Sequence, residues 1–203
     1  MIAQPKNWAS VQALPELPKL PAGAYICQIL HAAVTQTAAG DAMLALEIDI
    51  AEGDYRDYYR TKFDLLTSPN KRWQGALRLL LPCDDGSETD ERIKQTLKSM
   101  IAAVEASNAG YCCFVDGCFD ESTLEGKRIG ILFRNEEWDF NGRRGWSARA
   151  RRALSVDDVR AGRYTIPVDK PLSDRTDAAP AAASTPSTPY DSYTAVEKDD
   201  LPF

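Results

Sequence analysis

Residues 42–51 read AMLALEIDIA, and this stretch decides the fold. Every second residue is a large aliphatic, and the residues between them are mostly smaller or charged. The aliphatic face consists of Leu44, Leu46, Ile48 and Ile50, and the opposite face of Met43, Ala45, Glu47 and Asp49. Alternation with a period of two is typical of a β-strand that buries one face. The stretch therefore predicts a strand in a sheet with one face on the core.

A further strand is predicted on each side of this stretch. Residues 24–35 are rich in β-branched and aromatic side chains, and a turn at 38–41 joins them to it. Residues 52–54 turn the chain again, and residues 58–65 alternate as a third strand. In that third strand Tyr59, Thr61 and Phe63 would lie opposite Tyr58, Arg60 and Lys62. The three strands together predict a β-meander.

Helical signals follow the meander. Ser68 as an N-cap with Pro69 at the first helical position predicts a helix that runs to residue 81 and stops at Pro82. A second helix is predicted over residues 88–107, because its apolar residues recur at helical spacing. These apolar residues are Ile93, Leu97, Met100, Ile101 and Val104. The two helices predict a helical insertion at about 69–108.

Strand character returns after Gly110. Residues 127–138 and 145–153 alternate, and Asn141-Gly142 between them is a hairpin signal. The inward residues are expected to be Ile129, Ile131, Phe133, Trp146, Ala148 and Ala150. The outward residues are expected to be Arg128, Arg134, Ser147, Arg149 and Arg151. Residues 162–168 look like a closing extended segment.

These elements predict a mainly β domain with inserted helices over residues 22–168. Five short strands with a helix between the third and fourth favour a five-stranded OB-like Greek-key barrel, although another small β-barrel remains open. Residues 1–21, with four prolines, are expected to be an extended lead-in. Residues 169–203 are expected to be a disordered, acidic C-terminal tail, since residues 178–189 contain mainly Ala, Ser, Thr and Pro.

The net charge of −6 is unevenly distributed. From Asp169 onward seven acidic residues stand against three basic ones, whereas residues 126–166 carry ten Lys/Arg against five Asp/Glu. A basic segment beside an acidic tail favours a nucleic-acid binder with an anionic arm.

Single-strand binding requires cations along a groove and aromatic faces on which bases stack. Two segments of the sequence combine them. The first contains Arg56, Tyr58, Tyr59, Arg60, Lys62 and, further on, Trp73. The second contains Arg134, Trp138, Arg143, Arg144, Arg149 and Arg151. The alternative that Tyr59, Phe63, Trp73 and Trp146 are core residues stays open.

The sequence shows no clear arrangement of catalytic residues or metal ligands. With His31 as the single histidine, the sequence offers no Ser-His-Asp or Cys-His arrangement, and it contains no phosphate-binding loop. Glu136, Glu137 and Asp139 could in principle bind Mg²⁺ in a nuclease, but a solvated hairpin end is the simpler interpretation. The five cysteines contain no Cys-x-x-Cys pair. We expect no enzyme, no metal and no cofactor.

The chain ends in an acidic run that finishes on an aliphatic, a proline and a phenylalanine. An apolar anchor approached by negative charge suits a basic-rimmed hydrophobic pocket on another protein. The residues Asp199, Asp200, Leu201, Pro202 and Phe203 resemble the C-terminal tip of bacterial and phage single-stranded DNA-binding proteins. The resemblance implies that this tip recruits replication and recombination enzymes.

The body resembles a phage-encoded family of single-stranded DNA-binding proteins. The resemblance rests on the runs at 20–25, 44–48 and 53–55, on Arg60 and 63–64, and on 124–130, and it covers about residues 21–168. It implies sequence-independent coating of single-stranded DNA during phage or prophage replication and recombination. A replisome protein–protein adaptor is the alternative, and a metal-dependent nuclease a weaker third.

The location follows from the lack of apolar segments. We expect neither a transmembrane helix nor a signal peptide, and therefore a cytosolic protein without a membrane partner. The resemblance to a phage family implies the cytoplasm of a bacterial host. The oligomeric state stays open, a homodimer included.

Overall fold

The computed structural model describes residues 3–10 and 17–172, so the predicted linker and tip lie outside the described residues. The main strands are β1 (Gly23–Gln36), β2 (Ala42–Ile50), β3 (Ala76–Leu80), β6 (Arg128–Phe140) and β7 (Arg143–Leu154). The helices are α1 (Tyr58–Leu65), α2 (Glu88–Ser107) and α3 (Val156–Arg160). Smaller elements are η1 (Trp8–Ser10), β4 (Phe114–Val115), β5 (Cys118–Phe119) and η2 (Glu121–Leu124).

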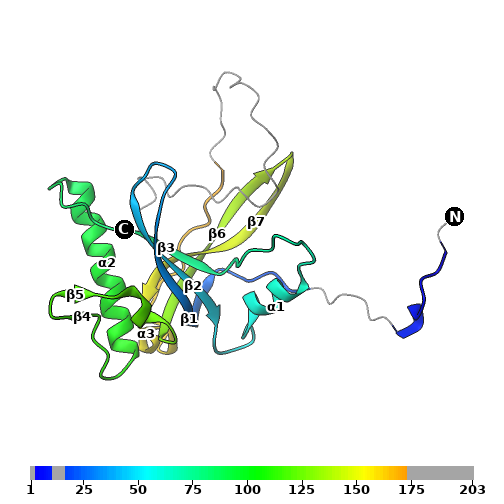
Figure 1. Cartoon of the computed structure of the whole chain (residues 1–203), viewed down its shortest axis with the longest axis horizontal. Helices are drawn as coiled ribbons and strands as arrows, with labels where there is room; N and C mark the ends of the chain where they lie inside the picture. The colour runs from blue at the N-terminus through cyan, green and yellow to red at the C-terminus, as the bar shows by residue number, and fades with distance from the viewer. Residues whose placement is uncertain (1–2, 11–16, 173–203) are drawn as a thin grey trace, which may run out of the picture.

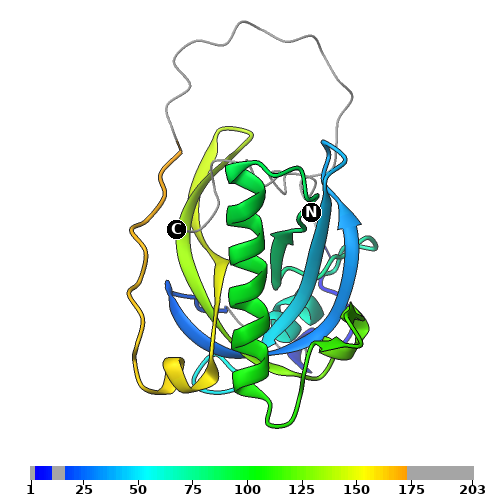
Figure 2. The same cartoon turned by 90° about the vertical axis from the view of Figure 1, so that its left-hand side faces the viewer.

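The five main strands form one antiparallel sheet in the order β3-β2-β1-β6-β7. The predicted mainly β fold with inserted helices is therefore confirmed. The sheet curves strongly, but hydrogen bonds do not close it into a barrel, because β3 and β7 are not paired in the described ladders. Helix α2 packs against β3, β6 and β7, and Figure 2 shows it lying across the open side between the two arms of the sheet.

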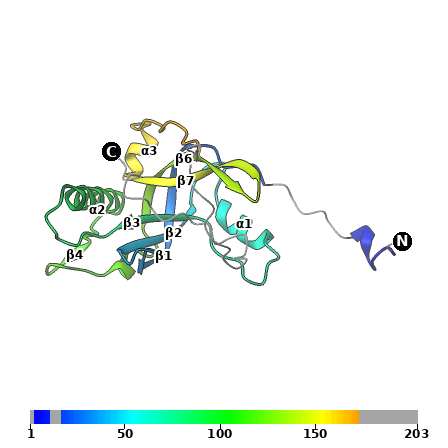
Figure 3. The same cartoon turned by 90° about the horizontal axis from the view of Figure 1, so that it is seen from above.

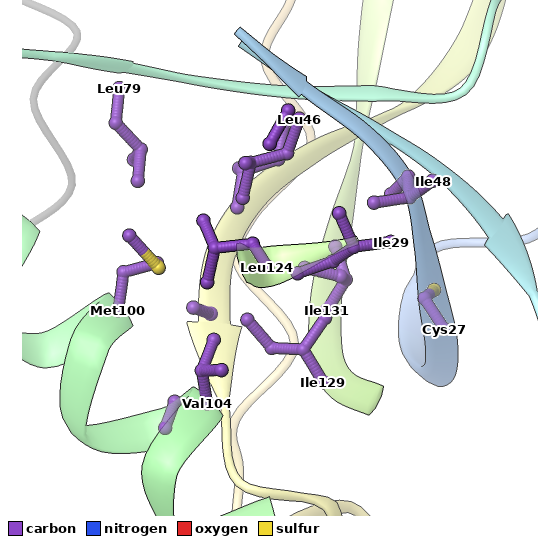
Figure 4. Close-up of a cluster of buried hydrophobic side chains, with 14 of the residues drawn as sticks. Cys27, Ile29, Leu46, Ile48, Leu79, Met100, Val104, Leu124, Ile129 and Ile131 are labelled. Atoms are coloured by element: carbon purple, nitrogen blue, oxygen red, sulfur yellow. The ribbon is translucent and has the colours of Figure 1, made fainter. Parts of the chain in front are cut away.

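The burial predicted for the aliphatic face of residues 42–51 is confirmed, although Met43 and Asp49 of the opposite face are buried as well. Leu44, Leu46, Ile48 and Ile50 are all buried, as are Ile129, Ile131 and Phe133 on β6. Figure 4 shows the aliphatic side chains of β1, β2 and β6 meeting Met100 and Val104 of α2, with Leu124 between them. The core therefore lies between the concave face of the sheet and α2.

Residues 58–65 form helix α1, so the predicted third strand is wrong there. The cause lies in β2: Asp49 is only 4% exposed, and its carboxylate accepts hydrogen bonds from the backbone N–H groups of Tyr59 and Arg60 at 2.9 and 3.0 Å. These donors belong to the first turn of a helix and need an acceptor. Asp57, the residue at the N-cap, makes no side-chain cap bond. A carboxylate from another element thus caps α1.

The environment of Asp49 is a balance of opposing effects. Burial raises the pKa of this carboxyl, while hydrogen bonds from the N–H groups of Tyr59, Ile50 and Arg60 act in the opposite direction. Asp49 lies on the face of β2 opposite the aliphatic set, where the sequence predicts solvent. At this end of β2 both faces are therefore covered, the second by the start of α1.

The third strand is β3, within the segment predicted to be the first helix, so that helix is also wrong. Leu77 and Leu79 pair with Leu46 and Leu44 of β2 and are buried. Immediately before β3, the backbone of Gly75 packs so tightly against Ile48 that a Cβ at this glycine would collide with the Ile48 carbonyl oxygen and the Tyr59 ring. Pairing with β2 therefore outweighs the local helix signal at Ser68-Pro69.

The second predicted helix is confirmed with its bounds. α2 begins after Ser87, whose hydroxyl accepts a hydrogen bond from the N–H of Asp90 at 3.1 Å. α3 begins in the same way after Ser155, which accepts from the N–H of Asp158 at 3.0 Å. That Ser-x-x-Asp pattern is visible in the sequence but was not part of the prediction. α1 and α2 lie at opposite ends of the sheet (Figures 1 and 3).

The β6–β7 hairpin projects past the start of β1, and its tip and the β1–β2 tip are the two ends of the sheet that rise in Figure 1. The pairing of β1 with β6 ends at Gly23 and Phe133, whereas β6 and β7 stay paired up to the turn. Asn141 and Gly142 both have positive φ, as the tight hairpin predicted from them requires. On its other edge β6 is met by Lys170, whose N–H donates to the Asn135 carbonyl at 2.9 Å.

Candidate nucleic-acid interface

Two exposed tryptophans mark the projecting hairpin. Trp138 on β6 is 39% exposed and Trp146 on β7 is 42% exposed. Trp146 follows the alternation of Ala148 and Ala150, which are half-buried and packed against the core. Trp146 was expected inside the core, and that expectation is wrong, because the strand continues past the point where the core ends. Its ring is available to a ligand.

Trp138 is held against the backbone of the opposite strand. It pairs with Gly145, and a Cβ at that position would lie 2.6 Å from the Trp138 ring. The absence of a side chain at Gly145 therefore allows the indole to lie close to β7. A ring fixed in this way offers a stacking surface without a large loss of side-chain entropy on binding.

Arginines flank the tip of the hairpin. Arg143 and Arg144 both directly follow the turn and are exposed. The Nε atom of Arg144 lies 3.0 Å from Asp139 Oδ2, so this guanidinium forms an ion pair with the Asp139 carboxylate. The predicted juxtaposition of cations and aromatics in this segment is thus present in the structure.

Further down the hairpin the arginines are more buried than the sequence predicts. The side chains of Arg134 and Arg151 are 19% and 17% exposed, and both contact Glu136 Oε1, at 2.8 and 3.5 Å. The expectation that Arg149 and Arg151 both face solvent is therefore wrong for Arg151, and Arg149 is half-buried. Glu136 therefore contacts two arginines at the base of the hairpin.

The aromatic residues of the first predicted segment belong to the core. Tyr58 and Tyr59 on α1 are buried, and the Tyr59 ring stacks on Phe133 at 6.4 Å between centroids. Trp73 is half-buried, and its indole N–H donates to the Ile48 carbonyl at 3.0 Å. These three side chains are unsuited to stacking on bases, which corrects their place in the predicted site. Their polar atoms and ring edges stabilise the end of the sheet instead.

The cations of that segment remain at the surface. Arg56, just before α1, and Arg60 on α1 are exposed, and Lys62 on α1 is half-buried. Burial lowers the pKa of Lys62, and the positive charge of Arg149 lowers it further. The fold thus brings Lys62 of the first segment close to Arg149 of the second. Sequence spacing could not indicate this, because 86 positions separate the two residues.

The acidic residues of the hairpin do not form a metal site. Strand alternation places Glu136 on the face opposite Glu137 and Asp139. Glu136 binds Arg134, and a Glu137 carboxylate oxygen accepts from the N–H of Leu172 at 3.0 Å. The predicted Mg²⁺ alternative therefore lacks converging carboxylates in the described part of the hairpin.

One other group of potential ligands occurs among the described residues, at the start of α2. It comprises Cys83, Asp85 and Asp90. The ammonium of Lys94 lies 3.0 Å from Asp90 Oδ2, and this cation together with the N–H of Cys83 outweighs burial and lowers the pKa of Asp90. Because a cation of the protein already occupies this carboxylate, we assign no metal to it. All five cysteines are free thiols.

No protein-family model and no curated protein matches this chain. Within residues 3–10 and 17–172, no helix combines the length and the apolar character of a membrane span.

Proposed function

We propose that this protein binds single-stranded DNA without sequence preference and has no catalytic activity of its own. The observation that carries the proposal is the projecting β6–β7 hairpin, which combines two exposed indole rings with a dense set of arginines. Base stacking on aromatic rings and backbone contacts to cations are the two interactions that such binding uses. Duplex DNA should bind more weakly, because its paired bases cannot reach the rings.

The fold supports this proposal through an OB-like interpretation of the sheet. A meander of β1, β2 and β3 is followed by α2 and then by a hairpin that packs back beside β1. The OB fold is a partly open five-stranded Greek-key barrel, and the loop between its last two strands takes part in binding oligonucleotides. The corresponding loop here is the tip of the β6–β7 hairpin.

The pair of Lys62 and Arg149 supports the same function electrostatically. Burial lowers the pKa of Lys62 and the positive charge of Arg149 lowers it further, so the two side chains lie within reach of each other's charge. A phosphate placed near both side chains would be attracted by both positive charges. We infer that the DNA backbone runs from the hairpin toward the exposed side of α1.

Fluorescence anisotropy with labelled oligo-dT tests the proposal. Saturable binding of oligo-dT, with much weaker binding of a duplex of equal length, is the expected result. Equal affinity for both would indicate a general cationic surface. A protein adaptor would leave oligo-dT unbound, and cleavage of end-labelled DNA in the presence of Mg²⁺ would support the nuclease alternative.

The affinity for oligo-dT should fall steeply with salt. Each phosphate contact releases counterions and contributes a slope of about −0.7 to the plot of log affinity against log salt for a single strand. We expect Arg143→Ala to flatten the slope by about one such contact. Lys98→Ala, which removes an exposed cation from α2, serves as the matched control and should leave the slope unchanged. A slope near zero for the wild-type protein would contradict backbone binding.

We further propose that the C-terminal tip recruits replication and recombination enzymes. The support is its sequence, because acidic residues precede a terminal Leu-Pro-Phe. Charge would aid the encounter with a basic partner, and the phenylalanine would supply the apolar anchor.

Phe203→Ala should separate recruitment from DNA binding. The substitution removes no charge, so affinity for oligo-dT should stay within about twofold of wild type, an effect of less than about 0.5 kcal/mol. Capture of a polymerase, primase, helicase or recombinase from host lysate should be lost. Tyr193→Ala, an aromatic change upstream of the tip, is the control and should capture the same proteins as wild type. Unchanged capture by Phe203→Ala would show that another segment recruits them.

A further inference from the structure

The two faces of the β6–β7 hairpin carry the same pair of side-chain types. Trp138 and Arg143 share one face, because Trp138 pairs with Gly145 and Phe140 pairs with Arg143 in the ladder. Trp146 and Arg144 lie on the other face, because they flank Gly145 in the strand and neighbouring residues point to opposite faces. Each face therefore presents one exposed indole and one arginine near the tip.

This arrangement limits what one strand can contact. The bases of a stacked single strand point to one side of its backbone, so a strand that stacks on Trp138 has its bases toward that face. Trp146 then lies behind the ribbon, out of reach of the same run of bases. A single strand should consequently use either face, and the two faces are alternatives for it.

A DNA fork presents the complementary geometry. The bases of two paired strands face each other, and where the strands separate, the first unpaired bases still point toward the space between them. A two-stranded β-ribbon inserted there meets bases on both faces and phosphates on its flanks. The narrow Asn141–Gly142 turn would enter first, with Arg143 and Arg144 just behind it, near the phosphates of the last base pair.

We propose that the β6–β7 hairpin binds single-strand–duplex junctions, with one separated strand on each face. This preference rests on the single-strand binding proposed above and names the DNA structure that engages the whole hairpin. The base of the hairpin is braced for such a role, because the N–H of Glu137 donates to the Lys170 carbonyl at 2.9 Å and the Lys170 N–H donates back to Asn135. The hairpin is thus paired on both edges of β6 where it leaves the body.

The test compares three DNA ligands with equal numbers of unpaired nucleotides. They are a fork with two unpaired arms, a duplex with one overhang, and oligo-dT. Wild-type protein should bind the fork at least about tenfold more tightly than oligo-dT, because a second stacking contact is added. Trp138→Ala and Trp146→Ala should each lower fork affinity by about tenfold. On oligo-dT each single variant should change affinity by less than about twofold, since the other face remains.

Two controls keep the result interpretable. Phe114→Ala removes an exposed aromatic from β4, outside the hairpin, and should affect none of the three ligands. Gly145→Ala displaces the Trp138 ring without removing it and should reproduce the fork defect of Trp138→Ala. Thermal unfolding of each variant near the wild-type Tm shows that the domain is folded.

The outcomes distinguish the two proposals. Binding of oligo-dT with identical losses on fork and oligo-dT for each single variant would overturn the junction preference and leave single-strand binding in place. Equal affinity of wild type for fork, overhang and oligo-dT would overturn it as well. Absence of binding to all three ligands would overturn both proposals.

Discussion

Replacing Trp138 and Trp146 together by alanine should lower the affinity for oligo-dT by about 10- to 100-fold. Stacking of a base on an aromatic side chain contributes about 1–3 kcal/mol, and the double variant leaves no indole on either face of the hairpin. Both rings are substantially exposed, so their removal opens no cavity in the core. Fluorescence anisotropy at constant salt measures the affinity, and thermal denaturation checks the fold.

A matched aromatic change separates this effect from a general loss of surface. Trp8→Ala removes an exposed indole from η1, outside the hairpin, and should leave the affinity within about twofold of wild type. If the double variant also bound within twofold, the hairpin would not be the stacking site. A fall in Tm of more than about 8 °C would instead assign the rings a structural role, because that corresponds to well over 1 kcal/mol in a domain of this size.

Asp49→Ala should lower the free energy of unfolding by about 3 kcal/mol or more. The substitution leaves the N–H groups of Ile50, Tyr59 and Arg60 without their acceptor in a buried place. An unsatisfied buried donor costs about 1–3 kcal/mol. Helix α1 loses its cap, and the helical turn that holds Tyr58 and Tyr59 in the core is weakened. Urea denaturation followed by tryptophan fluorescence measures the loss.

Asp57→Asn is the matched control for this prediction. Asp57 occupies the N-cap position of α1, where an aspartate usually caps the helix with its own carboxylate. Its side chain makes no such bond here. Its φ of 56° is tolerated by asparagine, so the change should cost less than about 0.5 kcal/mol. If Asp57→Asn proved the more damaging change, the cap of α1 would be local after all, and the role assigned to Asp49 would be wrong.

The three aromatic residues removed from the predicted site are held by contacts with other parts of the chain. Tyr58, Tyr59 and Trp73 were assigned to the interface because they stand next to cations in the sequence. Helix α1 turns Tyr59 toward Phe133 and Tyr58 toward Tyr55 and Tyr59, and the indole N–H of Trp73 bonds the Ile48 carbonyl. An aromatic next to a cation predicts a binding surface only when the secondary structure around it is known.

Consecutive residues alone determined much of the fold. Alternation in β2 and β6 predicted the aliphatic face that lies on the core, because the two faces of a strand are set by a period of two in the chain. Helix α2 was predictable because its apolar spacing and the Ser87 cap are both local. The Asn141–Gly142 turn was predictable because few residue pairs accept positive φ at both positions.

Only the tertiary structure decided the rest, because the determining partner lies elsewhere in the chain. α1 is a helix since Asp49 of β2 caps it, and β3 is a strand since β2 offers a pairing edge. Alternation predicted the face of β7 on which Trp146 lies but not its exposure. The period of a strand gives the side to which a residue points and does not show where along the strand the core ends. The effect of Arg149 on the pKa of Lys62 joins α1 to β7, two elements far apart in the chain, so no single segment encodes it.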